Sequence, residues 1–220
     1  MLEAADRRAA LATGIRLEVV TVGWMLVEAV LAIGAGIAAR SLLLTAFGLD
    51  SVIELISGAV LLWRLSLEAR GSATQPVERI EHRATQISAI LLVLLCVYVV
   101  MVGVIGLVTR LEPEASALGL GVSAVAVLVM PVLAWRKRLA NRTIGSSALR
   151  ADIAETITCA YMAGATLVGV GLNLLAGLWW AEYVAAFALL VFIVMEAREA
   201  VEASRESDAV PANNGETPDR

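Results

Sequence analysis

The chain has 220 residues, of which 59% are hydrophobic, and its formal net charge is -4 at pH 7. A soluble domain has closer to half apolar residues, so the composition excludes an ordinary soluble domain and indicates a membrane protein. The basic residues form no cluster that could bind nucleic-acid phosphates, so no nucleic-acid partner is expected. The two cysteines, Cys96 and Cys159, lie inside apolar runs, which argues against a disulfide framework.

Six apolar runs predict six transmembrane helices in an all-α, polytopic membrane protein. Each crossing of a bilayer needs roughly 20 residues, and the sixth run is short and must include polar residues at its ends. No run alternates with period two as a membrane β-strand would, so helices are the expected way to satisfy the backbone in lipid. The runs are residues 15–39, 42–65, 87–109, 117–135, 153–178 and 183–195.

These runs divide the chain into three parts. We expect residues 1–14 to form a cytoplasmic N-terminal segment and residues 15–198 to form the six-helix transmembrane domain. Residues 199–220 are expected to form a disordered cytoplasmic tail, because most of this segment is polar and it contains Pro and Gly. The first run is longer than the core of a signal peptide and no small-residue cleavage site follows it, so we expect it to remain as an anchor.

The distribution of Lys and Arg predicts the orientation in the membrane. On one side only Arg40 and Arg110 fall between helices, whereas 15 of the 17 basic residues fall on the other side. The positive-inside rule places this richer side, with both termini, in the cytoplasm, and we expect the protein in the plasma membrane. The 15 residues are Arg7, Arg8, Arg16, Arg64, Arg70, Arg79, Arg83, Arg136, Lys137, Arg138, Arg142, Arg150, Arg198, Arg205 and Arg220.

Two acids, Asp50 and Glu54, lie well inside the second apolar run. A charged side chain at the centre of a bilayer helix costs roughly 2.5–3.5 kcal/mol on insertion scales. The spacing i, i+4 places both carboxyl groups on one face of the helix, where they can share one ion. We interpret this face as a cation site. The alternatives are a hydrogen-bonded structural pair, or a dimer contact in which one carboxyl group is protonated.

Glu155 and Cys159 repeat the i, i+4 spacing in the fifth run. A carboxylate together with a thiolate suits a borderline ion such as Zn²⁺, so both are candidate metal ligands. The alternative for Cys159 is a small buried apolar residue. Asp152 lies one turn earlier and is either a ligand at the entrance or a residue at the helix start paired with Arg150.

The remaining acids and the single histidine have simpler interpretations. Glu28 lies midway along the first run without a basic residue at i±3 or i±4, so it has either a proton-coupling role or a structural hydrogen bond. Glu18, Glu182 and Glu196 lie near the ends of runs, and we expect them to be solvated. His82 lies between the second and third runs and is also expected to be solvated.

Enzyme motifs are absent from the sequence. There is no nucleotide-binding loop, no nucleophile elbow and no HExxH string. We therefore expect neither an enzyme activity nor a permanently bound cofactor, and a bound divalent cation would be cargo.

The second and fifth runs share a short internal similarity. A shift of 105 positions aligns Asp50 with Glu155, and the two segments would cross the membrane in opposite directions. The similarity either reflects two inverted halves of three helices each, a common transporter plan, or arises by chance. The other aligned pairs are Ser41 with Ser146, Leu44 with Leu149, Ala46 with Ala151, Ser51 with Thr156 and Val52 with Ile157.

Motifs in these runs resemble those of the cation diffusion facilitator family. The family's second-helix motif, S-x-A-L-x-A-D-x-x-[HD]-S-x-x-D, is matched within SLLLTAFGLDSVIE, residues 41–54, with Glu54 for the final Asp. The matching residues are Ser41, Leu44, Ala46, Asp50 and Ser51. The fifth-helix motif, similar to A-D-A-x-H-x-x-x-D, corresponds to ADIAETITC at residues 151–159, where Ala151 and Asp152 match. The sixth helix of the family often opens with D-P-[IV]-x-A, and EYVAA at residues 182–186 keeps this pattern loosely.

The resemblance implies a membrane domain that exports a divalent metal cation, commonly zinc, in exchange for protons, usually as a homodimer in the lipid bilayer. Asp50, Glu54, Glu155 and Cys159 would be the metal ligands. Glu155 stands where the family usually has His, and Cys159 where it has Asp, so the identity of the metal is open. About 20 polar residues follow the last run, so we expect a shortened relative without the family's C-terminal cytoplasmic domain.

Two other functions fit the same buried acids. A proton-coupled antiporter of small organic cations would use them without a metal and would not need Cys159. A non-transporting membrane scaffold would use them for contacts between helices. Their loss would then lower the stability of the protein and would not affect any ion flux.

Overall fold

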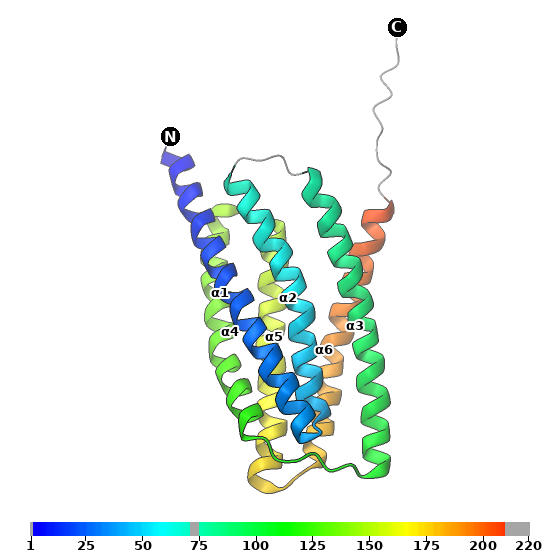
Figure 1. Ribbon diagram of the computed structural model, residues 1–220. Helices are drawn as coiled ribbons and strands as arrows, with labels where there is room; N and C mark the ends of the chain where they lie inside the picture. Colours follow the sequence, from blue (N-terminus) through cyan, green and yellow to red (C-terminus); the bar gives the residue numbers. More distant parts are fainter. Residues whose placement is uncertain (1, 71–74, 210–220) are drawn as a thin grey trace.

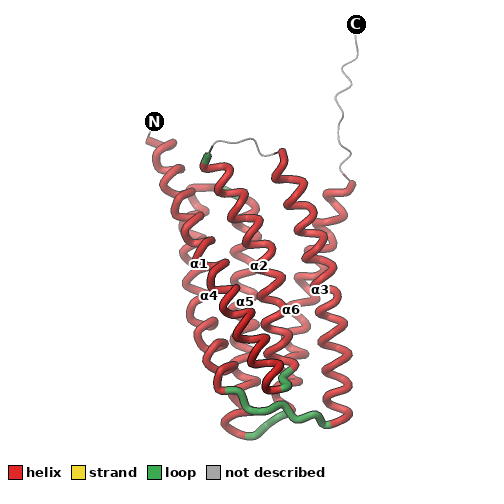
Figure 2. Tube along the Cα trace, in the orientation of Figure 1, coloured by secondary structure: helices red, strands yellow, loops and turns green. Residues whose placement is uncertain are grey.

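The computed structural model describes residues 2–70 and 75–209, and within this part of the chain it is entirely α-helical apart from short connections (Figures 1 and 2). The predicted all-α fold with six helices is confirmed, and five of the helices are long and apolar enough to cross a membrane. The sixth has a comparable length but is less apolar. The helices are α1 (Leu2–Ala39), α2 (Leu42–Ala69), α3 (Gln75–Thr109), α4 (Ala117–Ile144), α5 (Ser147–Ala176) and α6 (Trp180–Ala209).

The helices run side by side, and each is antiparallel to the next along the chain (Figure 1). Helices α1, α2, α4 and α5 contact one another in a closed ring, and α3 and α6 pack together beside α2 and α5. Helix α1 begins and α6 ends at the same end of the bundle, which we call the termini end. The connections α1–α2, α3–α4 and α5–α6 lie at the opposite end (Figure 2).

Several helices extend further than the apolar runs predict. Helix α1 begins at Leu2, so most of the predicted N-terminal segment 1–14 is helical. Helix α6 continues to Ala209, so the tail predicted from residue 199 is helical over its first part, and residues 210–220 lie outside the described part of the chain. The runs counted apolar residues alone, whereas the backbone bonds of a helix continue where the helix leaves lipid for water.

The internal similarity between the second and fifth runs coincides with a shared local structure. Ser41 caps the N-terminus of α2 by accepting from the backbone N–H of Leu44, and Ser146 caps α5 by accepting from Leu149 in the same way. A serine at this position satisfies one of the free N–H groups of the first turn. The two aligned motifs therefore begin their helices identically, which supports an arrangement of two related halves.

The contacts between helices have nearly the same symmetry. Exchanging α1, α2 and α3 for α4, α5 and α6 maps the contacts α1–α2 and α2–α3 onto α4–α5 and α5–α6, and leaves α1–α4, α2–α5 and α3–α6 unchanged. The contact between α2 and α6 departs from this symmetry, because α3 and α5 are not among the closely packed pairs of the described helices. As described below, the α2–α6 contact carries the candidate site.

Close approach of α1 and α2 depends on two glycines. A Cβ atom at Gly36 would lie 2.6 Å from the backbone nitrogen of Thr45, and one at Gly48 would lie 2.8 Å from that of Ile33. Small residues of this kind let the backbones of membrane helices approach closely. Elsewhere the bundle exposes large apolar side chains, as α3 does at Val93, Val97, Val104 and Val108. Such a surface fits lipid.

We predict that Gly36→Ala lowers the melting temperature of the purified protein in detergent, because the added methyl group meets backbone atoms and overpacking costs about 1–3 kcal/mol. The matched control is Gly34→Ala in the same helix, where a Cβ atom meets nothing within 4 Å. The control should keep or slightly raise the melting temperature, since Ala stabilises a helix by roughly 0.5–1 kcal/mol over Gly. Equal effects of the two substitutions would contradict the packing described here.

Candidate cation site

Three carboxyl groups meet between α2 and α6. One oxygen each from Asp50, Glu54 and Glu196 lies within 4.8 Å of the other two. Asp50 and Glu54 are 1% and 5% exposed. Both oxygens of Asp50, both oxygens of Glu54 and Oε1 of Glu196 are buried and have no hydrogen-bond partner among the described residues. This cluster, which we call the acidic triad, is a concentration of acidic groups without a partner among the described residues.

The acidic triad lies on the wall of a cavity of about 330 Å³. The described residues that line this cavity include no Lys, Arg or His, so no basic side chain there balances the acids. Hydroxyl groups of three residues add further oxygen atoms to the wall. The lining residues are Asp50, Ile53, Glu54, Ser57, Thr85, Ser88, Leu92, Ala151, Glu155, Glu196, Glu199 and Ala200.

A second cavity, of about 130 Å³, adjoins the first. The two share the lining residues Ser57, Thr85, Ala151 and Glu155. The second cavity extends to Ala148, which lies in the first turn of α5 at the termini end. Together the cavities lead from the termini end of the bundle to the acidic triad.

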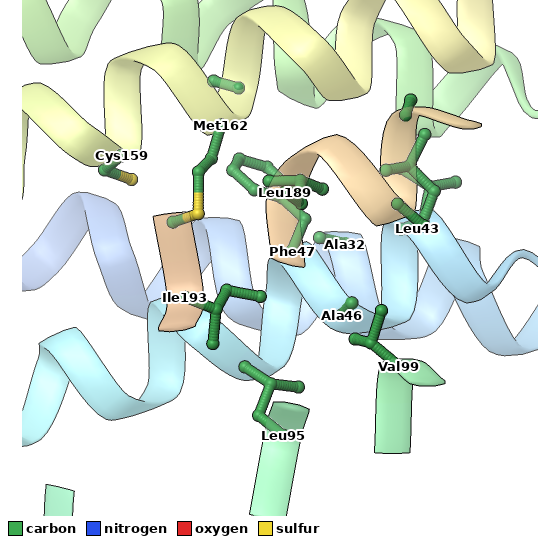
Figure 3. Close-up of a cluster of buried hydrophobic side chains, with 14 of the residues drawn as sticks. Ala32, Leu43, Ala46, Phe47, Leu95, Val99, Cys159, Met162, Leu189 and Ile193 are labelled. Carbon is green, nitrogen blue, oxygen red and sulfur yellow. The ribbon is translucent and has the colours of Figure 1, made fainter. Parts of the chain in front are cut away.

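An apolar layer lies on the side of the triad that faces the opposite end, and Figure 3 shows side chains of this layer packed together. Phe47 of α2, Met162 of α5 and Leu189 of α6 are each at most 1% exposed. Phe47 and Leu189 precede the triad acids of their helices, which run towards the termini end, and Met162 follows Glu155 in a helix that runs away from it. This packed layer closes the bundle beyond the triad.

The two candidate ligands of α5 occupy different places. Glu155 lines both cavities but lies outside the set of oxygens that approach within 4.8 Å. Cys159 is fully buried, and its Sγ atom lies 3.8 Å from Oε1 of Glu28. The thiol does not line either of these cavities. The structure thus brings Asp50 and Glu54 together with an acid from α6. It places Cys159 off the cavity wall, beside Glu28 of α1 and close to Glu54.

Glu28 is fully buried and well supplied with donors. Ser51 donates to its Oε1 at 2.7 Å, and the indole N–H of Trp24 donates to its Oε2 at 2.8 Å. Of the two roles considered for Glu28, the structural hydrogen bond is present, and the proton-coupling role stays a prediction.

A buried ion network connects α1, α4 and α5 near the termini end. Lys137, which is fully buried, lies 2.9 Å from Oε2 of Glu18 and 2.6 Å from Oδ2 of Asp152. The prediction that Glu18 is solvated is therefore wrong, and Asp152 pairs with Lys137 in place of Arg150. Lys137 belongs to the buried stripe of α4 that includes Met130 and Ala134, so helical packing decides its burial.

Glu182 is also buried, so its predicted solvation is wrong. It accepts from the hydroxyl of Ser41 and, at 2.6 Å, from Nδ2 of Asn173. The contact joins α2, α5 and α6 at the opposite end of the bundle. A polar residue at the end of an apolar run can thus be part of the packed interior. His82 lies in α3 at a position whose side chain is outside the described part of the chain.

Glu196 and Lys137 are the functional candidates that the sequence interpretation missed. Both lie beyond the apolar runs, yet both continue a buried face at helical spacing. Glu196 follows the buried Leu189 and Ile193 of α6 by seven and three residues, and Lys137 follows Met130 of α4 by seven. Continuing the buried face of each helix at helical spacing past the last apolar residue would have identified both.

Comparison with protein-family models gives a match to the cation efflux transmembrane domain over residues 18–207. The chain belongs to the cation efflux family. Its fold, its buried acids and this match together make it a multi-pass membrane transporter that exports cations. No match was found among individual curated protein sequences. The matched segment includes every acid of the acidic triad and of the Lys137 network.

We predict that Lys137→Met destabilises this cation efflux protein strongly, because it leaves Glu18 and Asp152 buried without a counter-charge. Removing one partner of a buried pair costs on the order of 3–5 kcal/mol. The measurement is the melting temperature in detergent, with Arg138→Met, an exposed neighbour, as the control. The triple variant Glu18→Gln/Lys137→Met/Asp152→Asn should recover most of the loss, since it removes the uncompensated charges. A triple variant as unstable as Lys137→Met would contradict the electrostatic explanation.

Proposed function

We propose that the protein exports a divalent metal cation in exchange for protons and binds the ion at Asp50 and Glu54. The observation that carries this proposal is the pair of buried carboxyl groups without hydrogen-bond partners at the inner end of a cavity. Ionised carboxylates at this depth are costly unless something neutralises them. A metal cation and protons are two ways to neutralise the same oxygens, which is the basis of their exchange.

The charge of the site favours a divalent ion over a monovalent organic one. Three carboxyl groups whose oxygens lie within 4.8 Å can supply up to three negative charges when they release their protons, which is more than one ammonium group can balance. A small organic cation would fit the cavity by volume but would leave this charge in excess. The organic-cation antiporter therefore remains the second candidate.

The direction of transport follows from the positive-inside rule. Arg136, Arg138 and Arg142 lie near the termini end of α4 and are exposed, whereas Arg40 and Arg110 lie at the opposite end. We infer that the termini end faces the cytoplasm. The ion would then enter through the two adjoining cavities, and release would require the apolar layer around Phe47 and Leu189 to open.

Two inverted halves provide a mechanism for that opening. Rocking of one half against the other around a fixed site is the usual mode of alternating access in transporters built from inverted repeats. The described arrangement has the site connected to the termini end, which corresponds to a state ready to load. A homodimer in the plasma membrane, which the family resemblance implies, stays a prediction that the mass of the purified protein in detergent can test.

The test is uptake of divalent cations into proteoliposomes that contain a metal-sensitive dye, with and without a pH gradient. The wild-type protein should give flux that depends on the gradient. Asp50→Asn and Glu54→Gln should each reduce it at least tenfold, because each removes a charge that binds the ion. Glu202→Gln, an exposed acid of α6, is the matched control and should transport normally.

Each other outcome has a definite meaning. Normal flux in Asp50→Asn and Glu54→Gln would remove these acids from the transport site. Export of organic cations without any metal flux would select the second candidate. Folded wild-type protein that moves neither class of cation would reject transport as the function.

A further inference from the structure

We infer that Glu196 of α6 is the third ligand of the transported ion and that the site binds it through oxygen alone, which selects a hard divalent cation such as Mn²⁺. The inference rests on the proposed function, and it deepens it by naming a ligand and a class of ion. Its evidence is the geometry of the acidic triad, the unpaired state of its oxygens and the chemistry of the cavity wall.

The geometry allows one ion to contact all three acids. Hard divalent cations bind oxygen at about 2.0–2.6 Å, so two oxygens on one ion are at most about 4–5 Å apart. The oxygens of Asp50, Glu54 and Glu196 are within 4.8 Å of one another. Small rotations of these side chains would therefore close them around one ion.

The acidic triad is the exception among the buried acids of the described chain. Glu28 accepts from Ser51 and Trp24, and Glu182 accepts from Ser41 and Asn173. Glu18 and Asp152 are paired with Lys137. The four oxygens of Asp50 and Glu54 and one of Glu196 have no such partner, although Asp50 and Glu54 are more than nine-tenths buried. Every other buried acid of the described chain has a hydrogen-bond donor or a lysine as its partner. The acids of the triad have neither, so their oxygens are free to bind a ligand.

The cavity wall provides oxygen donors and no softer ones. Its polar side chains are five carboxyl groups and the hydroxyl groups of Ser57, Thr85 and Ser88. The Ser88 hydroxyl is buried and has no partner among the described residues, so it is available as a neutral ligand. Sites made of carboxylate, hydroxyl and water oxygens suit Mg²⁺, Ca²⁺ and Mn²⁺, whereas zinc sites usually include nitrogen or sulfur.

The thiol that favoured zinc lies off the cavity wall. Cys159 contacts Glu28 and lies close to Glu54, but neither Cys159 nor Cys96 lines the cavity. Among the hard cations, Mg²⁺ gives up its water reluctantly, which hinders transfer through an all-protein site. Mn²⁺ combines the oxygen preference with easier loss of water, and we take it as the representative of this class of ion for the test.

The position of Glu196 explains why this site differs from a symmetric one. Asp50 aligns with Glu155 between the halves, and a symmetric site would use α2 and α5 together. The departure from symmetry in the contacts brings α6 against α2, and Glu196 is the residue that this contact adds to Asp50 and Glu54. The third ligand thus comes from the one helix pair without an equivalent.

The test is direct binding of Mn²⁺ to the full-length protein in detergent, measured by the loss of the electron paramagnetic resonance signal of free Mn²⁺. Wild-type protein should bind Mn²⁺, and Glu196→Gln should weaken binding at least tenfold. The control Glu202→Gln, the same chemical change on an exposed face of α6, should bind as the wild type does. Melting temperatures confirm folding of each variant, and Glu196→Asp, which keeps the charge but shortens the side chain, provides a second variant with an expected smaller loss.

Competition between ions tests the oxygen-only character. Because first-row divalent ions bind most sites more tightly from Mn²⁺ towards Cu²⁺, the expected signature is a small preference, with Zn²⁺ displacing Mn²⁺ at no more than a tenfold advantage. Glu196→His, which introduces a nitrogen donor, should raise the preference for Zn²⁺ over Mn²⁺ at least tenfold.

The outcomes separate this inference from the proposed function. Unchanged Mn²⁺ binding in Glu196→Gln would overturn the assignment of Glu196. A site that binds Zn²⁺ but no Mn²⁺, and loses Zn²⁺ in Cys159→Ser, would overturn the oxygen-only assignment while leaving divalent export intact. Mn²⁺ binding that depends on Glu196, without flux of any ion in proteoliposomes, would reject the transport function and keep the ligand.

Discussion

The constraint on which this structure depends is that a carboxylate buried in a membrane bundle needs a neutralising partner. The chain meets the constraint in three ways. A buried lysine, Lys137, neutralises two acids at once, and hydroxyl, amide and indole donors support Glu28 and Glu182. At Asp50 and Glu54 the described residues provide no partner, and we propose that the transported cation takes this place. The acids of the first two kinds hold helices together, whereas those of the third kind are the ones left to bind an ion.

The arrangement of helices serves the same division. A nearly symmetric set of contacts relates α1, α2 and α3 to α4, α5 and α6, and the α2–α6 contact departs from this symmetry at the acidic triad. Packed apolar side chains close the triad off from the opposite end of the bundle, whereas two cavities connect it to the termini end. The interior surfaces of α2, α5 and α6 therefore determine whether an ion can reach the triad. The outer faces of the helices only need to be apolar.

Much of this was predictable from residue patterns. The helices, the capping serines, and the placement of Asp50 and Glu54 on one face follow from hydropathy and from helical spacing, because both are local properties of the chain. The partners of the acids were not predictable in the same way, because they depend on which helices touch. Arg150 is near Asp152 in sequence, yet Lys137 from α4 is its partner in space. Similarly, Cys159 has the spacing of a ligand, but packing turns its thiol towards Glu28.

Glu196 shows where the local reasoning could have gone further. It was assigned to solvent because the apolar run ends at Met195, although the buried face of α6 continues at helical spacing through Ile193. Hydropathy measures the average of a segment, whereas burial depends on the phase of each residue around the helix axis. In a membrane bundle with acids in its interior, the candidate site residues are the acids that lie at helical spacing from the buried residues of the same helix.

One helix is attached at both of its ends. Near the termini end, Asp152 of α5 is bound through Lys137 to α4 and α1, and near the opposite end Asn173 of α5 is bound through Glu182 to α6 and α2. Both of the direct contacts of α5 lie within the half formed by α4, α5 and α6. The contacts that cross between the halves are Lys137 with Glu18 of α1 and Glu182 with Ser41 of α2, one at each end of the bundle. A rocking motion of one half against the other would therefore have to lengthen or break one of these two crossing contacts, and α5 would move with α4 and α6.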